Sequence, residues 1–78
     1  MAKEKAGELD KKIGEQIQFY RDVQGKKDRH WLGERISRSY QQVQNYEEGK
    51  QRVAASCLYR IAKALKTPIE KFFPGKDD

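Results

Sequence analysis

The chain has 78 residues, enough for one small domain, and its 17 Lys and Arg outnumber 12 Asp and Glu to give a net charge of +5. One cysteine and one histidine exclude an intrachain disulfide and a zinc-ligand cluster, and no apolar stretch is long enough for a signal peptide or membrane span. We therefore expect a cytoplasmic, nucleoid-associated protein with an anionic partner, nucleic acid before an acidic membrane. A mildly basic domain without such a partner would show the same balance.

Catalytic chemistry has little support in the composition. There is one histidine, no glycine loop of the kind that cradles phosphate, and no pair of carboxylates in an apolar setting. We expect a protein that is not an enzyme and needs neither a metal nor another cofactor.

A first helix is expected to begin with Asp10 as its N-cap. Ile13, Ile17 and Tyr20 recur at i, i+4 and i+7 and form one apolar stripe, and Gly25 marks the turn that follows. Residues 1–9 are polar and lysine-rich, which predicts a flexible tail ahead of a domain that covers residues 10–74. Residues 75–78 are the expected C-terminal tail.

A second helix should start at the cap Asp28 and place Leu32 and Ile36 in the core. Gly33 within it costs up to about 1 kcal/mol relative to alanine, which suggests that another backbone approaches closely. Residues 37–39 form a polar break. Ser39 followed by Gln42 then fits a capping box that opens a third helix, of about residues 40–48.

Gly49 has the position of a C-terminal glycine cap for this third helix, and a basic loop follows it. A fourth helix carries Leu58, Ile61, Ala62 and Leu65 with helical spacing. Thr67, as N-cap before a proline, predicts a fifth helix whose apolar side chains are Ile69, Phe72 and Phe73. The sum is an all-α, compact five-helix bundle in which helices 2 and 3 form a helix-turn-helix.

The third helix has two distinct faces at about 100° per residue. Val43 and Tyr46 point to the core, whereas Gln41, Gln44 and Asn45 lie on the opposite side. Gln and Asn side chains pair bidentately with adenine in the major groove, so this face suits base reading. The alternative is a merely solvated face, for which Lys and Glu would be the commoner residues.

These segments resemble the lambda repressor/Cro-type helix-turn-helix family, often called XRE-like. The resemblance runs from Ile13 to about Phe73 and is carried by I-G-E-Q-I (13–17) with Arg21, L-G-E-R-I (32–36), S-Y-Q-Q-V-Q-N-Y-E-E-G-K (39–50) and L-Y-R-I-A-K-A-L (58–65), continued by T-P-I-E-K-F-F. Two features depart from the family pattern: K-K-D (26–28) at the entry to the second helix, and Ala54 where the fourth helix often has a Ser or Thr cap.

The resemblance implies roles for individual positions. The expected base-reading residues are Tyr40, Gln41, Gln44 and Asn45. For Tyr40, a thymine methyl, a phosphate and packing against the second helix are all open. The expected phosphate-binding residues are Arg29, Arg38, Ser39, Gln42, Lys50 and Arg52. In the family an arginine that matches Arg21 pairs with a glutamate that matches Glu47 and braces the recognition helix.

The resemblance also implies a sequence-specific transcriptional regulator, expected to be a repressor that binds a palindromic operator in double-stranded DNA as a homodimer. Ile69, Phe72 and Phe73 are the expected dimer contact. One alternative is an antitoxin that binds a toxin protein and represses its own operon. Another is nucleoid or RNA binding without sequence preference.

Overall fold

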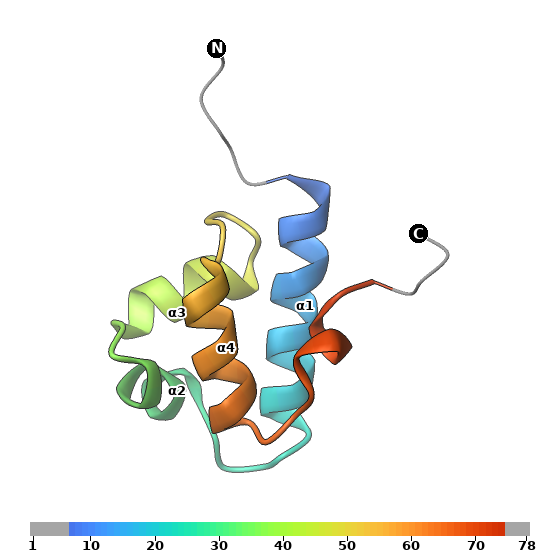
Figure 1. Cartoon of the computed structure of the whole chain (residues 1–78). Helices are drawn as coiled ribbons and strands as arrows, with labels where there is room; N and C mark the ends of the chain where they lie inside the picture. Colours follow the sequence, from blue (N-terminus) through green and yellow to red (C-terminus); the bar gives the residue numbers. More distant parts are fainter. Residues whose placement is uncertain (1–6, 75–78) are drawn as a thin grey trace.

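The computed structural model describes residues 7–74 as a helical bundle (Figure 1). Its elements are α1 (Glu8–Asp22), α2 (Arg29–Ile36), α3 (Tyr40–Glu47), α4 (Ala55–Ala64) and a single-turn 3-10 helix, η1 (Ile69–Phe72). The all-α class is confirmed, but the expected count of five helices is wrong, because four α-helices are present in this range. None of the helices between residues 7 and 74 is long and apolar enough to cross a membrane.

One core joins all five elements. α1 packs on α3 and η1, α2 packs on α3 and α4, and η1 also touches α4. Every apolar residue that the periodicity assigned to the core of the first four helices is buried except Tyr20, which is partly buried. The fully buried large side chains, less than 2% exposed, are Ile17, Leu32, Ile36, Val43, Ile61, Leu65 and Phe72, with Cys57 beside them.

The start of α1 differs from the expectation. Gly7 is the N-cap and Asp10 lies three residues into the helix, where its carboxylate accepts a 2.8 Å hydrogen bond from the backbone N–H of Gly7. A carboxylate at this position satisfies an N-terminal donor from inside the helix, so the helix starts three residues earlier than expected. Of the two expected tails, residues 1–6 and 75–78 lie outside the described range, and residues 8–9 are already helical.

The C-terminal element is one 3-10 turn instead of a fifth α-helix, and Thr67 does not cap it. The Thr67 hydroxyl donates to the carbonyl of Leu65 at 2.9 Å, and Pro68 precedes the turn. Pro74 disfavours helical geometry at the residue before it, so few positions remain for helix. Phe72 alone of this turn's side chains is fully buried.

Glycines at two helix crossings let backbones meet. A Cβ atom built on Gly33 would lie 2.6 Å from the carbonyl oxygen of Arg38, which confirms the close approach expected there. A Cβ on Gly14 would overlap the carbonyl oxygen of Tyr46 at the end of α3. These contacts set how α3 lies against α1 and α2.

Candidate nucleic-acid interface

The turn between α2 and α3 is held by backbone and side-chain bonds. Ser37 adopts the left-handed conformation (φ 59°), and the N–H of Arg38 returns to the carbonyl of Gly33 at 2.9 Å. The predicted caps are confirmed on both helices: Asp28 accepts from the N–H of Trp31 at 2.9 Å and Ser39 from the N–H of Gln42 at 3.0 Å. A three-residue break thus fixes the angle between the two helices.

α3 ends as the sequence predicted. Gly49 has φ 74°, its N–H bonds to the carbonyl of Tyr46 at 3.1 Å, and the N–H of Lys50 bonds to the carbonyl of Asn45 at 2.9 Å. This pair of bonds is a Schellman motif, which requires the left-handed residue that glycine supplies. The loop to α4 therefore leaves α3 in a defined direction.

The outward face of α3 carries a row of amides linked by hydrogen bonds. Gln41 donates to Asn45 at 3.3 Å, and Gln44 donates to Glu48 at 3.2 Å, both at i, i+4 spacing. Asn45 in turn reaches Gln51 in the following loop at 3.5 Å. Gln41 is exposed and the other two amides of α3 are partly buried. The row is accessible, and these exposed bonds can be exchanged for others at little cost.

Tyr40 lies back against α2, one of the three arrangements left open by the sequence. Its ring stacks on the imidazole of His30, with centroids 4.5 Å apart and planes at 17°. The side chain is still 42% exposed, so it borders the amide row while it packs on α2.

A buried carboxylate joins three helices behind the amide row. The Glu47 side chain is fully buried and accepts from Arg21 of α1 at 2.7 and 2.9 Å. It also accepts from Nε of Arg29, the first residue of α2, at 2.8 Å. Hydrogen bonding to this carboxylate raises the pKa of both arginines. Two guanidinium groups on one carboxylate leave a net charge of 2 − 1 = +1 at the start of α2.

The remaining expected phosphate ligands surround α3 at different depths. Lys50 is 68% exposed and forms an ion pair with Glu48 at 3.1 Å, which lowers the pKa of that carboxyl group. Arg52 is tied to α1 through Asp10 at 3.2 Å. Arg38 is partly buried, and a hydrogen bond with Tyr46 is the main cause that raises its pKa. Ser39 is exposed, and Gln42 beside it is partly buried.

Curated relatives of similar sequence are named as transcriptional regulators. A transcriptional regulator in the ATPase CF(0) region of Rhodospirillum rubrum, named as uncharacterised, is 54% identical over 46 residues, which are 59% of this chain and 43% of the relative. An uncharacterised HTH-type transcriptional regulator of Sinorhizobium medicae is 37% identical over 71 residues, 91% of this chain and 50% of the relative. The chain thus spans about half the length of these relatives. No family model matches it.

The fold also recurs in solved structures. The restriction-modification controller protein C.AhdI from Aeromonas hydrophila superposes with a TM-score of 0.76 at 21% identity, over 81% of this chain and 94% of that one. The DNA-binding domain of BldD gives 0.74 at 24% identity, over 85% and 94%. The chain therefore shares the helix-turn-helix fold of these proteins, and its curated relatives are named as transcriptional regulators, in agreement with the resemblance to the lambda repressor/Cro-type, XRE-like family.

Part of an enzyme has the same fold. Hydroxypropylphosphonic acid epoxidase from S. wedmorenis matches with a TM-score of 0.76 at 25% identity, over 85% of this chain but 35% of the enzyme. The likeness is limited to that portion, and the relatives found by sequence are named as regulators. The same fold therefore occurs both in a free-standing controller protein and in one portion of an enzyme.

The family pattern accounted for one ion pair and missed two others. The expected contact of Arg21 with Glu47 is confirmed. The second guanidinium on Glu47, from Arg29, was expected only at phosphate, because sequence spacing gives no distance between α2 and the end of α3. The Asp10–Arg52 pair spans 42 positions and left no local signal either.

The expected dimer residues divide by burial. Phe72 is fully buried in the core, where its ring lies 5.5 Å from that of Tyr20, so it has no exposed surface to offer a second copy of the chain in this conformation. Ile69 and Phe73 are 37% and 43% exposed. Ile69 lines a shallow groove of about 550 Å³ between α4 and η1, together with Tyr59, Ala62, Lys63, Lys66, Thr67 and Pro68.

Proposed function

We infer that this chain is the DNA-binding domain of a transcriptional regulator that reads a specific operator with the amide face of α3. The observation that carries the proposal is the outward-facing row of Gln41, which is exposed, and Gln44 and Asn45, which are partly buried, on a helix fixed at both ends. Amide side chains offer a donor and an acceptor together, which is the pattern that the major-groove edge of adenine complements. The regulator names of the relatives support the same function.

In this mechanism the groups around α3 divide the work. The amides read base edges, and Tyr40 reaches the adjacent base or sugar from its place on His30. Lys50, Arg38 and the Ser39 hydroxyl bind phosphates on either side of the groove, and Arg29 adds the positive charge of its cluster with Glu47. Phosphate contacts fix the register and supply affinity, whereas the amides supply discrimination.

A single recognition helix reads too few base pairs to select one site in a genome, so we propose a homodimer on a two-fold symmetric operator. Tyr59 and Ile69, which are 56% and 37% exposed along the α4–η1 groove, supply its apolar contact. Binding at a promoter then excludes other proteins from the same DNA, which makes the regulator a repressor.

A competition experiment tests the base-reading role. Labelled operator bound to the wild-type chain is competed with unrelated duplexes, and the measurement is repeated with Gln41→Ala. We expect the preference to fall by about tenfold or more, because a good bidentate contact discriminates by ~1–3 kcal/mol. Lys50→Ala is the matched control: it should weaken all duplexes alike and leave the preference unchanged. An unaltered preference in Gln41→Ala would show that another surface reads the bases.

A further inference from the structure

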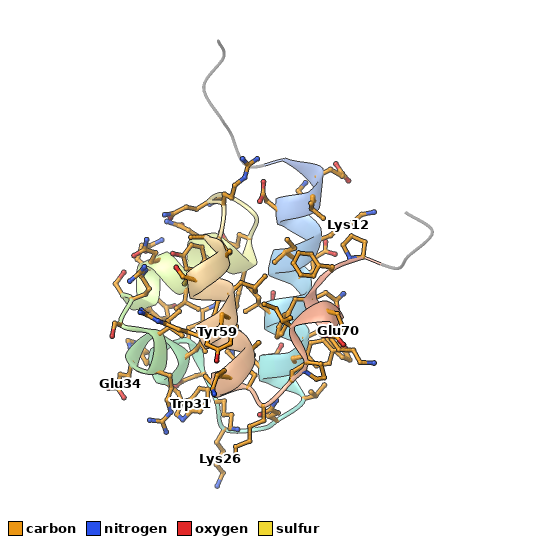
Figure 2. All side chains as sticks on the ribbon, viewed as in Figure 1. Lys12, Lys26, Trp31, Glu34, Tyr59 and Glu70 are labelled. Atoms are coloured by element: carbon orange, nitrogen blue, oxygen red, sulfur yellow. The ribbon has the colours of Figure 1, made fainter. Side chains whose placement is uncertain are left out.

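Three large apolar side chains lie along the outer side of α1 and just after its end, where they take no part in the buried core. Leu9, Phe19 and Val23 are 51%, 53% and 60% exposed, and with Lys12 and Gln16 they follow a 3-4-3-4 spacing. We call these five residues the outer seam. Lys12 projects away from the bundle (Figure 2). Such spacing produces a straight stripe that a second helix can cover, as in a coiled coil.

An acidic row flanks the outer seam on one side. Glu8, Glu15 and Asp22 recur every seven residues and are all exposed. Asp22 pairs with Arg21 at 3.3 Å, whereas neither Glu8 nor Glu15 forms an ion pair with any residue between 7 and 74. The chain as a whole has a net charge of +5. The acidic row makes the surface beside the seam negatively charged, whereas the surface around α3 carries several cations. A partner that covers the seam would gain from a complementary row of cations.

A second copy of the chain does not supply that complement. If two α1 helices packed antiparallel about a two-fold axis, the acidic row of one would face the acidic row of the other. If they packed in parallel, the acidic row would face the flank of Ile13 and Tyr20, on which α1 carries no cation. An anionic lipid surface would be repelled by the same carboxylates.

We propose that the outer seam of α1 is a docking site for an amphipathic helix of another protein, with an apolar face and a row of Lys or Arg beside it. At about 100° per residue, Gly14 and Arg21 lie on the side of α1 opposite the seam. Both are buried, and they lie against Tyr46 and Glu47 of α3. The seam therefore faces away from α3. The partner can dock while α3 holds DNA, so this site is independent of the function proposed above.

A designed helical peptide provides the probe. It carries leucine at each a and d position and lysine at each e and g position, and its twin has glutamate in place of lysine. Binding of each labelled peptide is followed by fluorescence anisotropy, and the contact is mapped by amide chemical shifts of the 15N-labelled chain. We expect the lysine peptide to shift amides on the outer side of α1 and to bind about tenfold or more tightly than its twin.

Variants of the seam complete the test. Phe19→Ser with Val23→Ser should weaken the lysine peptide by about ten- to a hundredfold, and Glu15→Lys should weaken it without loss of apolar surface. Tyr59→Ser is the matched control, because Tyr59 has similar exposure (56%) on α4 and should not affect the peptide. Duplex affinity should be the same for the seam variants and wild type, which separates this result from the proposed function.

Four results would overturn the proposal, and the first three concern the peptides. They are equal affinity for the two peptides, chemical shifts confined to other helices, and peptide binding that is unchanged in the seam variants. A fourth is loss of self-association in the Phe19 and Val23 double variant by sedimentation velocity, which would make a second copy of the chain the occupant.

Discussion

The fully buried carboxylate of Glu47 holds α3 in place through ion pairs with two arginines. Its carboxylate takes three hydrogen bonds from two arginines that belong to α1 and α2, so a single residue near the end of α3 fixes both neighbouring helices. The net positive charge of this cluster makes any loss of the carboxylate unfavourable, because the two guanidinium groups would then repel each other in a poorly solvated place.

We expect Glu47→Gln to lower the free energy of unfolding by about 3–5 kcal/mol, the usual cost of a buried charge left without its partner. Urea unfolding followed by circular dichroism measures the change. Glu48→Gln is the matched control, because the Glu48 side chain is 36% exposed and pairs only at the surface with Lys50; its unfolding midpoint should stay close to wild type. Equal midpoints for the two variants would contradict a structural role for the buried carboxylate.

The ionisation of Tyr46 makes the free energy of unfolding depend on pH in the alkaline range. Its pKa is raised, chiefly because burial disfavours the phenolate, although a hydrogen bond from Arg38 acts against this. Below about pH 10 the phenol is protonated in both states. As pH rises further, the unfolded chain loses the proton first, so folding stability falls until the pH passes the folded-state pKa. Tyr46→Phe should show a smaller loss between pH 9 and 11, roughly the range in which tyrosine ionises, measured by urea midpoints. Parallel pH profiles for the two proteins would refute this assignment.

At the scale of elements, local capping signals predicted the bounds of α2 and α3 well, but they predicted the start of α1 and the type of the last element poorly. Asp28, Ser39 and Gly49 act within a few residues of their own position, so their capping roles could be predicted from the sequence. Thr67 and Pro68 formed an equally good local signal. There the Thr67 hydroxyl bonds back to the carbonyl of Leu65 and does not cap the turn that follows Pro68.

Close packing of α1 on α3 gives a prediction for Gly14. An added methyl group would overlap the carbonyl oxygen of Tyr46, so Gly14→Ala should lower the free energy of unfolding by about 1–3 kcal/mol. Gly7→Ala adds the same atom where nothing lies within 4 Å, and its effect should stay below about 1 kcal/mol. Thermal or urea unfolding compares the two. If both substitutions cost the same, the crossing is looser than described.

At the scale of the molecule, the charges are arranged around α3 in a way that composition could not predict. The net charge of +5 indicated an anionic partner, and helical periodicity placed the amides outward, but pairing depends on distances between helices. Arg52 pairs with Asp10 and Arg29 with Glu47, which lie 42 and 18 positions away along the chain. The sequence therefore predicted which side chains of α3 face outward better than it predicted how the cations around α3 pair.

Salt dependence checks which cations reach phosphate. The slope of log K against log salt should become shallower by roughly 0.9 for each phosphate that a variant no longer neutralises. We expect this change for Lys50→Ala, whereas Lys12→Ala, an equal change of charge on the outer side of α1, should leave the slope as in wild type. Equal slopes for all three proteins would remove Lys50 from the interface.

The most direct test of the central claim is selection of binding sites from random duplexes by the purified chain, repeated with Gln41→Ala and Asn45→Ala. Our account predicts that the wild type enriches a two-fold symmetric sequence with half-sites about 34 Å apart, and that each substitution relaxes the preference at defined base pairs. Selection that enriches no sequence, or the same sequence for all three proteins, would contradict base reading by α3.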